Sequence, residues 1–230
     1  MERRRRVAAD PREQAAYTVA EAAHYLDLPV PTIRYWATGR GNCEALIGVP
    51  ARHPVLLSFL NLAELHVLAA IRREHAISMP RVRAAIGYLA QHTRRDSDRR
   101  HPLISADLET DGLDLFIERY GQLVSISQDG QTVMREMMAA ALHRIDRDPQ
   151  GVPIKLYPFT RSSIDDAPAL IVIDPTLAAG RPVLRGTGLA TGILAERYKA
   201  GESVAELARD YERSEAEIEE AIRCELWTAA

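Results

Sequence analysis

The chain has 230 residues, of which 47% are hydrophobic and 27% charged, and it contains 13 prolines. This composition fits a globular protein with a sizeable core and argues against intrinsic disorder. No run of about 18 apolar residues occurs, and the first ten residues lack a signal-peptide core, so we expect a cytoplasmic protein without a membrane span.

The two cysteines, Cys43 and Cys224, lie far apart, and neither has histidine or cysteine neighbours at metal-ligand spacing. We therefore expect no disulfide, no metal and no cofactor.

Charge is distributed unevenly along the chain. Residues 1–100 contain 16 Lys and Arg against 10 Asp and Glu, a net charge of +6. The remaining residues contain 13 against 22, a net charge of −9. This asymmetry suggests different partners for the two ends of the chain.

Residues 17–40 predict two short helices joined by a tight turn. Thr18 and Glu21 have the spacing of a capping box, and Pro31 fits the first turn of the second helix. The helical period then directs Ile33 and Trp36 inward and leaves a polar outward face without acidic residues. The candidate DNA-binding residues are Thr18, Pro31, Thr32, Arg34, Tyr35, Thr38 and Arg40. The four arginines of residues 3–6 are either a solvated tail or a further contact to the DNA backbone.

The next segments predict a small winged element followed by helices. Residues 41–57 are rich in glycine, proline and short apolar pieces, which indicates a hairpin wing. Asn61 with Glu64 has capping-box spacing and predicts the start of a helix, and Ser78 predicts the start of another. Residues 72–100 carry eight positive against three negative side chains, either as a solvated surface or as contacts to phosphate.

The centre of the chain predicts a mixture of strands and one helix. Within residues 101–130, apolar residues alternate with polar ones, which predicts a hairpin that ends at Asp129-Gly130. The apolar residues of this pattern are Leu113, Leu115, Ile117, Val124 and Ile126. A methionine-rich helix over residues 131–146 and a strand over residues 151–159 follow. The methionines indicate either core packing or a dimer interface.

The last part of the chain predicts a strand over residues 170–173 and then three helices. Ser203 with Glu206 and Ser214 with Glu217 form two successive capping boxes. This is a second helix-turn-helix outline, but residues 203–225 carry three positive and eight negative side chains. Phosphate repels such a surface, so we expect a protein partner there.

Together these patterns predict a mainly α protein with small β-hairpin and sheet elements, an α+β fold. The predicted parts are a winged-helix-like DNA-binding region (residues 1–100), a central α+β region for dimerisation (101–160), a linker (161–169) and a C-terminal three-helix domain (170–230).

No pattern in the sequence requires an enzyme. The segment GRPVLRGTG at residues 180–188 lacks the Lys-Ser/Thr ending of a P-loop and the GxGxxG spacing of a dinucleotide-binding loop. The seven histidines show no metal-ligand grouping. A metal-dependent nuclease built on Asp165 and Asp166 has no third ligand nearby.

Two stretches resemble known families. Thr18-Val19-Ala20-Glu21-Ala22 and Ile33-Arg34-Tyr35-Trp36 resemble the helix-turn-helix of MerR and excisionase-like regulators. Residues 170–225 resemble a small domain of unknown function found in many VapB-type antitoxins. That second resemblance rests on these separate motifs in the family's order: Ile173-Asp174-Pro175, Gly180-Arg181-Pro182-Val183, Arg185-Gly186-Thr187, Ala200-Gly201-Glu202-Ser203 and Asp210-Tyr211.

The combination is similar to mycobacterial-type VapB antitoxins that carry both parts. It implies a homodimeric antitoxin that neutralises a PIN-domain ribonuclease toxin and acts as a transcriptional repressor by binding operator DNA. Arg34 and Tyr35 would inherit the family's phosphate and groove contacts, while Leu28-Pro29-Val30-Pro31 departs from the family's usual turn. The alternative is a stand-alone MerR-like regulator whose C-terminal region senses a small molecule.

Overall fold

Two short α-helices follow a 3-10 helix (Pro11–Glu13) and a two-residue strand, and the sequence predicts both α-helices. The computed structural model describes residues 10–41, 43–73, 79–93, 96–109, 111–123, 128–161, 163 and 167–226. Helix α1 (Val19–Tyr25) begins with the predicted capping box: the Thr18 hydroxyl accepts from the Glu21 N–H at 3.1 Å, and the Glu21 carboxylate accepts from the Thr18 N–H at 2.8 Å. Helix α2 (Val30–Thr38) begins after Pro29 and has Pro31 in its first turn.

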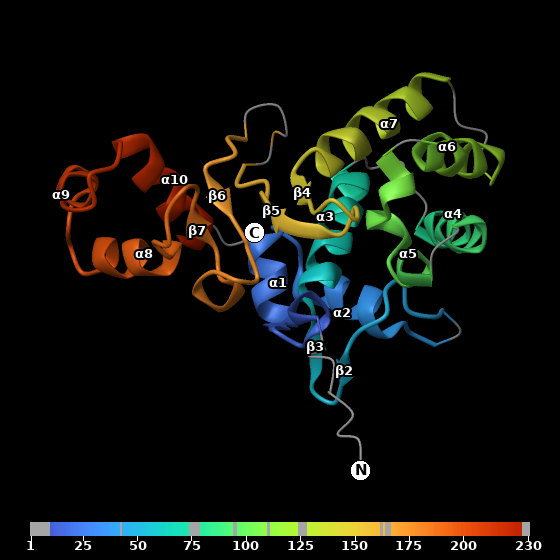
Figure 1. Cartoon of the computed structure of the whole chain (residues 1–230), viewed down its shortest axis with the longest axis horizontal. Helices are drawn as coiled ribbons and strands as arrows, with labels where there is room; N and C mark the ends of the chain where they lie inside the picture. Colours follow the sequence, from blue (N-terminus) through green and yellow to red (C-terminus); the bar gives the residue numbers. More distant parts are fainter. Residues whose placement is uncertain are drawn as a thin grey trace, which may run out of the picture.

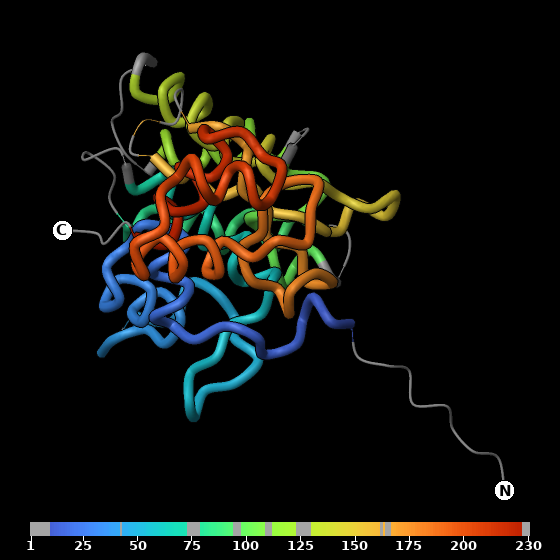
Figure 2. The backbone as a smooth tube through the Cα atoms, turned by 90° about the vertical axis from the view of Figure 1, so that its left-hand side faces the viewer, coloured from blue at the N-terminus to red at the C-terminus, as the bar shows by residue number. Residues whose placement is uncertain are grey.

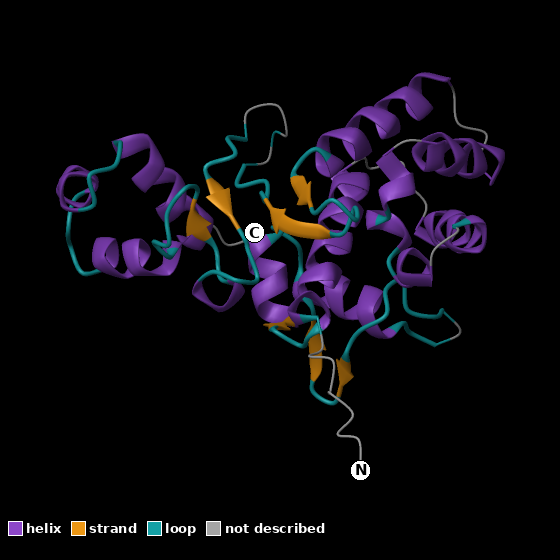
Figure 3. Cartoon of the chain, in the orientation of Figure 1, coloured by secondary structure: helices purple, strands orange, loops and turns teal. Residues whose placement is uncertain are grey.

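The predicted wing is present as part of a three-stranded antiparallel sheet. Strands β2 (Ala51–Arg52) and β3 (Val55–Leu57) form the hairpin, and β1 (Tyr17–Thr18) pairs with the other edge of β3. The hairpin projects from the lower edge of the body in Figure 3. This sheet ties the start of α1 to the wing.

Helix α3 (Phe59–Arg73) is the central helix of the fold. Its N-terminal cap differs from the prediction, because Ser58 and Asn61, not Asn61 and Glu64, exchange side-chain-to-backbone hydrogen bonds, both at 3.1 Å. The helix starts earlier than expected because Phe59 and Leu60 are already buried. Residues 59–71 are buried on every side of the helix, including the polar side chains of Asn61, Glu64 and His66, so the helix lies inside the protein.

Helices α4 (Met79–His92) and α5 (Asp96–Arg100) follow α3. Pro80 lies in the first turn of α4, as predicted, whereas its predicted cap, Ser78, lies outside the described residues.

The predicted hairpin within residues 101–130 is wrong. Residues 111–123 form helix α6 (Asp111–Leu123), and helix α7 (Gln128–Leu142) contains Asp129 and Gly130. Leu113, Phe116, Ile117 and Tyr120 are buried at helical spacing, in a helix that packs against α4 and α7. The alternation of Leu113, Leu115 and Ile117 therefore reflects one helical turn. Val124 and Ile126 lie outside the described residues.

Two small antiparallel sheets connect the centre to the C-terminal part. Strands β4 (Ile145–Arg147) and β5 (Pro153–Leu156) form one, and β6 (Ile171–Val172) and β7 (Val183–Leu184) form the other. The backbones of Leu156 and Ile173 exchange two hydrogen bonds, at 3.0 and 2.8 Å, which join the sheets.

The three predicted C-terminal helices are confirmed as α8 (Thr191–Lys199), α9 (Val204–Asp210) and α10 (Glu215–Leu226). Both predicted capping boxes are present, with Glu206 accepting from the Ser203 N–H at 2.8 Å and Glu217 accepting from the Ser214 N–H at 3.0 Å. In Figure 1 these helices lie at the opposite end of the molecule from α6 and α7.

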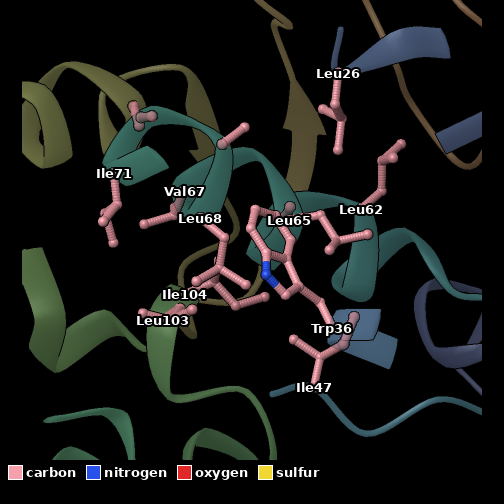
Figure 4. Packing of buried hydrophobic residues seen from close by; sticks show 14 of the residues in the cluster. Leu26, Trp36, Ile47, Leu62, Leu65, Val67, Leu68, Ile71, Leu103 and Ile104 are labelled. Atoms are coloured by element: carbon pink, nitrogen blue, oxygen red, sulfur yellow. The ribbon is translucent and has the colours of Figure 1, made fainter. Parts of the chain in front are cut away.

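Among the residues that the structure describes, the buried apolar side chains form one large and two smaller clusters. The large cluster extends in sequence from Tyr17 to Ile173 and surrounds α3, where Trp36 packs among leucines and isoleucines (Figure 4). A separate cluster lies between α8, α9 and α10 and includes Leu194, Leu207 and Ile218. None of the described helices is long and apolar enough to cross a bilayer.

Contacts distant in sequence join the C-terminal helices to the rest of the protein. The Tyr17 hydroxyl donates to the Gly180 carbonyl at 2.9 Å, and Glu225 of α10 lies 3.6 Å from His24 of α1. Glu220 of α10 is buried and accepts from Thr160 and Arg161. Figure 2 shows α8 to α10 lying across one side of the body.

Candidate nucleic-acid interface

Helix α2 has one buried and one exposed face. Ile33, Trp36 and Ala37 point into the core and are at most 1% exposed. Arg34 and Thr38 lie on the opposite side and are exposed. The helical period predicted this division, because residues three or four apart share a face.

A shallow hollow of about 840 Å³ lies along this exposed face and the turn that follows it. Its lining residues are Pro31, Arg34, Tyr35, Thr38, Gly39, Arg40, Gly41 and Cys43. Five of the seven predicted DNA-binding residues are therefore brought together. Since the lining contains two arginines and no carboxylate, its potential favours an anion.

The other two predicted residues lie outside the hollow. Thr32 is half-buried on α2. Thr18 is exposed at the start of α1, where its hydroxyl accepts from the Glu21 N–H and donates to the Glu21 carboxylate at 2.8 Å. The capping box therefore already uses the hydroxyl of Thr18.

The floor of the hollow is held by Trp36 and the turn after α2. The Trp36 side chain is fully buried, and its carbonyl accepts from the Leu46 N–H at 2.7 Å. Gly39 has φ +73°, and a Cβ there would collide with the Cys43 carbonyl, so the tight turn requires glycine. The exposed side chains of α2 thus project from a rigid support.

Arg83 of α4 also reaches this site. Its Nη2 lies 3.4 Å from the Tyr35 hydroxyl, and its guanidinium carbon lies 5.8 Å from the Tyr35 ring centroid. The same guanidinium donates to the Glu44 carbonyl. These contacts restrict the Tyr35 ring and bring a third arginine to the edge of the hollow.

The sequence did not single out Arg83 as a site residue. The available signal was the basic segment of residues 72–100, in which Arg83 is one of eight arginines. Arg81 and Arg83 are about 200° apart on a helix, and only the packing of α4 determines which of them approaches α2.

Two other sequence-based candidates lie outside the described residues: the arginines at 3–6, and Asp165 with Asp166 of the nuclease alternative. In the described part of the chain, no three His, Cys, Asp or Glu side chains come together as metal ligands.

Comparisons with known proteins bear on the C-terminal domain and on the chain as a whole. The profile of the family described as "Protein of unknown function (DUF433)" matches residues 171–223, within the predicted C-terminal domain. A crystal structure of Rv2018 from Mycobacterium tuberculosis superposes with a TM-score of 0.70 at 26% identity, covering 91% of this chain and 98% of that one.

A relative that matches along most of the chain decides the family. The protein named "Putative antitoxin VapB45" from Mycobacterium tuberculosis (strain ATCC 25618 / H37Rv) is 31% identical over 221 residues, covering 85% of this chain and 87% of the relative. The chain belongs to the VapB45-like antitoxin family. Because the match covers most of both chains, the similarity to this relative extends beyond residues 171–223.

Proposed function

We propose that this chain is the antitoxin of a type II toxin–antitoxin pair. It binds and neutralises a PIN-domain ribonuclease toxin in the cytoplasm, and it represses their shared operon by binding operator DNA. The observation that carries the DNA part is the hollow along α2, where Arg34, Tyr35, Thr38 and Arg40 are brought together without an acidic neighbour in the lining.

The geometry of this hollow suits nucleic acid. In helix-turn-helix proteins the second helix enters the major groove, and arginines contact phosphates or base edges. Here α2 is the second helix, its buried face is anchored by Trp36, and the wing residues Arg52 and His53 are exposed. The wing would contact the adjacent backbone.

A homodimer fits operator recognition, because two-fold proteins bind half-sites about 34 Å apart. The sequence suggested the 131–146 helix as the dimer interface. In α7, Met134 and Met138 are buried in the protein's own core, while Val133 is 38% exposed. A dimer contact through α7 would therefore use the side of the helix that carries Val133.

The DNA part is tested by an Arg34→Ala variant. We expect operator binding to weaken by about 1–3 kcal/mol if Arg34 contacts a base edge, measured by gel-shift titration at fixed salt. Arg209→Ala, which removes an exposed arginine from α9, is the matched control and leaves affinity unchanged. Equal affinity of Arg34→Ala and wild type would refute the assignment of α2.

The toxin part is tested by co-expression with any short gene that adjoins this one and encodes a PIN-type protein. We expect a stable complex and relief of the growth arrest that the toxin causes alone. Operator binding without complex formation would favour the stand-alone regulator over the antitoxin.

A further inference from the structure

A second surface feature lies between the C-terminal helices, away from α2. It is a groove of about 540 Å³, lined by Tyr198 of α8, Val204 of α9, and Glu219, Ile222, Arg223 and Leu226 of α10. Tyr198 is 42% exposed and Leu226 is 36% exposed. Large apolar side chains in a groove with a polar rim mark an interaction site.

The charge around this groove is negative. Residues 191–226 contain ten Asp and Glu against five Lys and Arg. Several of the basic groups are already engaged: Arg197 pairs with Glu202 and Asp210, and Arg213 lies 3.8 Å from Glu217.

Two acidic residues without a salt bridge among the described residues, Glu215 and Glu219, lie along one side of α10. Both are exposed, and they lie one turn apart. Glu215, Glu219, Ile222 and Leu226 are three or four residues apart and therefore lie on the same side of α10. This side of the helix is acidic toward its N-terminus and apolar toward its C-terminus. Its occupant should carry the complementary pattern, with basic residues beside apolar ones.

This pattern excludes the ligand proposed for α2. Phosphate is repelled by Glu215 and Glu219, and the groove offers Arg223 alone as a lining cation, which lies 3.7 Å from the buried Glu220. A nucleic-acid backbone would also leave the apolar side chains of the groove without apolar partners. A protein segment can place basic side chains near the acidic part of the surface and apolar side chains against the apolar part.

We propose that the groove between α8 and α10 receives a basic amphipathic helix of the toxin. The helix inserts apolar side chains against Tyr198, Ile222 and Leu226 while its Lys or Arg residues lie near Glu215 and Glu219. Amphipathic helices bind such grooves through apolar anchors at i, i+3 and i+4. This proposal rests on the proposed antitoxin function and adds the surface and chemistry of the partner.

Two variants of the full-length chain test this proposal in binding measurements with the purified toxin of the neighbouring gene. The toxin is used as a catalytically inactive variant. Tyr198→Ala removes the apolar anchor, and Glu219→Lys reverses the charge. We expect each to weaken toxin binding about tenfold or more by calorimetry. The loss for Glu219→Lys should shrink at high salt because it is electrostatic.

Matched controls lie on α8, outside the groove. Ile193→Ala removes another apolar side chain of α8, which is 49% exposed, and Glu196→Lys makes the same charge reversal there. Both should bind toxin like wild type. All variants should bind operator DNA like wild type and unfold at the wild-type temperature, which separates a groove effect from misfolding.

Three results overturn the proposal, and they are distinguishable from one another. Wild-type toxin affinity in both groove variants would show that the toxin binds elsewhere, with the antitoxin function itself intact. Loss of chain dimerisation in Tyr198→Ala, seen by light scattering without a change in toxin affinity, would assign the groove to a second copy of the chain. Failure of the wild type to bind the toxin would instead reject the antitoxin function together with this site.

Discussion

Glu64 and His101 meet inside the protein. The His101 Nδ1 lies 2.9 Å from the Glu64 carboxylate, and the two side chains are only 13% and 1% exposed. Burial raises the pKa of Glu64 more than the hydrogen bond from His101 lowers it. For His101, burial acts to lower the pKa, but the hydrogen bond and charge of Glu64 act together to raise it above its ordinary 6.5. Both shifts make the folded protein bind protons more tightly than the unfolded chain.

Because the folded state holds these protons more tightly than the unfolded chain, the free energy of unfolding decreases as pH rises through the range where they are released. The contribution of His101 is fully present below pH 6.5, its unfolded pKa, and is lost as pH rises through its folded pKa. The raised pKa of Glu64 acts in the same direction. We expect the free energy of unfolding to fall as pH rises above 6.5 more steeply in wild type than in Glu64→Gln/His101→Gln, measured by urea titration at each pH.

A single substitution provides the control for this pair. His101→Ala leaves Glu64 buried without its charge partner and should cost about 3–5 kcal/mol at about pH 6, as breaking a buried ion pair does. Parallel pH profiles for wild type and the double variant would show that the pair does not titrate in this range.

At the scale of elements, a contact between β1 and the segment before β7 joins parts of the chain that are 163 residues apart. Gly180 has φ +78°, and a Cβ there would lie 2.5 Å from the Tyr17 hydroxyl oxygen, which donates to the Gly180 carbonyl. An L-amino acid at this position would be strained and would also displace Tyr17. The contact thus depends on glycine for two separate reasons.

We expect Gly180→Ala to lower the free energy of unfolding by about 2–4 kcal/mol, the sum of backbone strain and overpacking. Gly186→Ala is the matched control, because Gly186 has φ +75° but no atom within 4 Å of its would-be Cβ. The difference between the two variants in urea titration isolates the collision with Tyr17.

A double variant tests whether the collision with the Tyr17 hydroxyl causes the loss of stability in Gly180→Ala. Tyr17→Phe removes the hydroxyl, so Gly180→Ala should cost less in the Tyr17→Phe background than alone. If Gly180→Ala is no more destabilising than Gly186→Ala, the Tyr17 contact contributes nothing to this cost.

At the scale of the whole molecule, the charges separate the two proposed partners. The hollow along α2 is lined with two arginines, whereas residues 191–226, which contain α8 to α10, carry ten acidic against five basic residues. Operator binding should therefore release counterions from the DNA, and the logarithm of the binding constant should fall linearly with the logarithm of salt concentration.

We expect Arg34→Gln/Arg40→Gln to reduce the steepness of this salt dependence by about two units, one for each phosphate that is no longer neutralised. Fluorescence anisotropy with labelled operator DNA at several salt concentrations measures the slope. Lys199→Gln/Arg209→Gln removes two exposed positive charges from the acidic end and should leave the slope unchanged. An unaltered slope in the first variant would place the DNA away from α2.

Features that depend on neighbours within one helical turn could be predicted from the sequence. The capping boxes at Thr18, Ser203 and Ser214 and the outward face of α2 were predictable, because the atoms involved lie three or four residues apart. The antitoxin family was also predictable, since its motifs occur in order along the chain.

Features that depend on distant partners required the folded structure. The Leu113, Leu115 and Ile117 pattern fits a strand or a helix, and burial against α4 and α7 selects the helix. Ser58, not Asn61, caps α3 because the core already encloses Phe59. Arg83 approaches Tyr35 across 48 residues, and Tyr17 approaches Gly180 across 163. The energy of these contacts comes from packing between segments, which a local pattern does not contain.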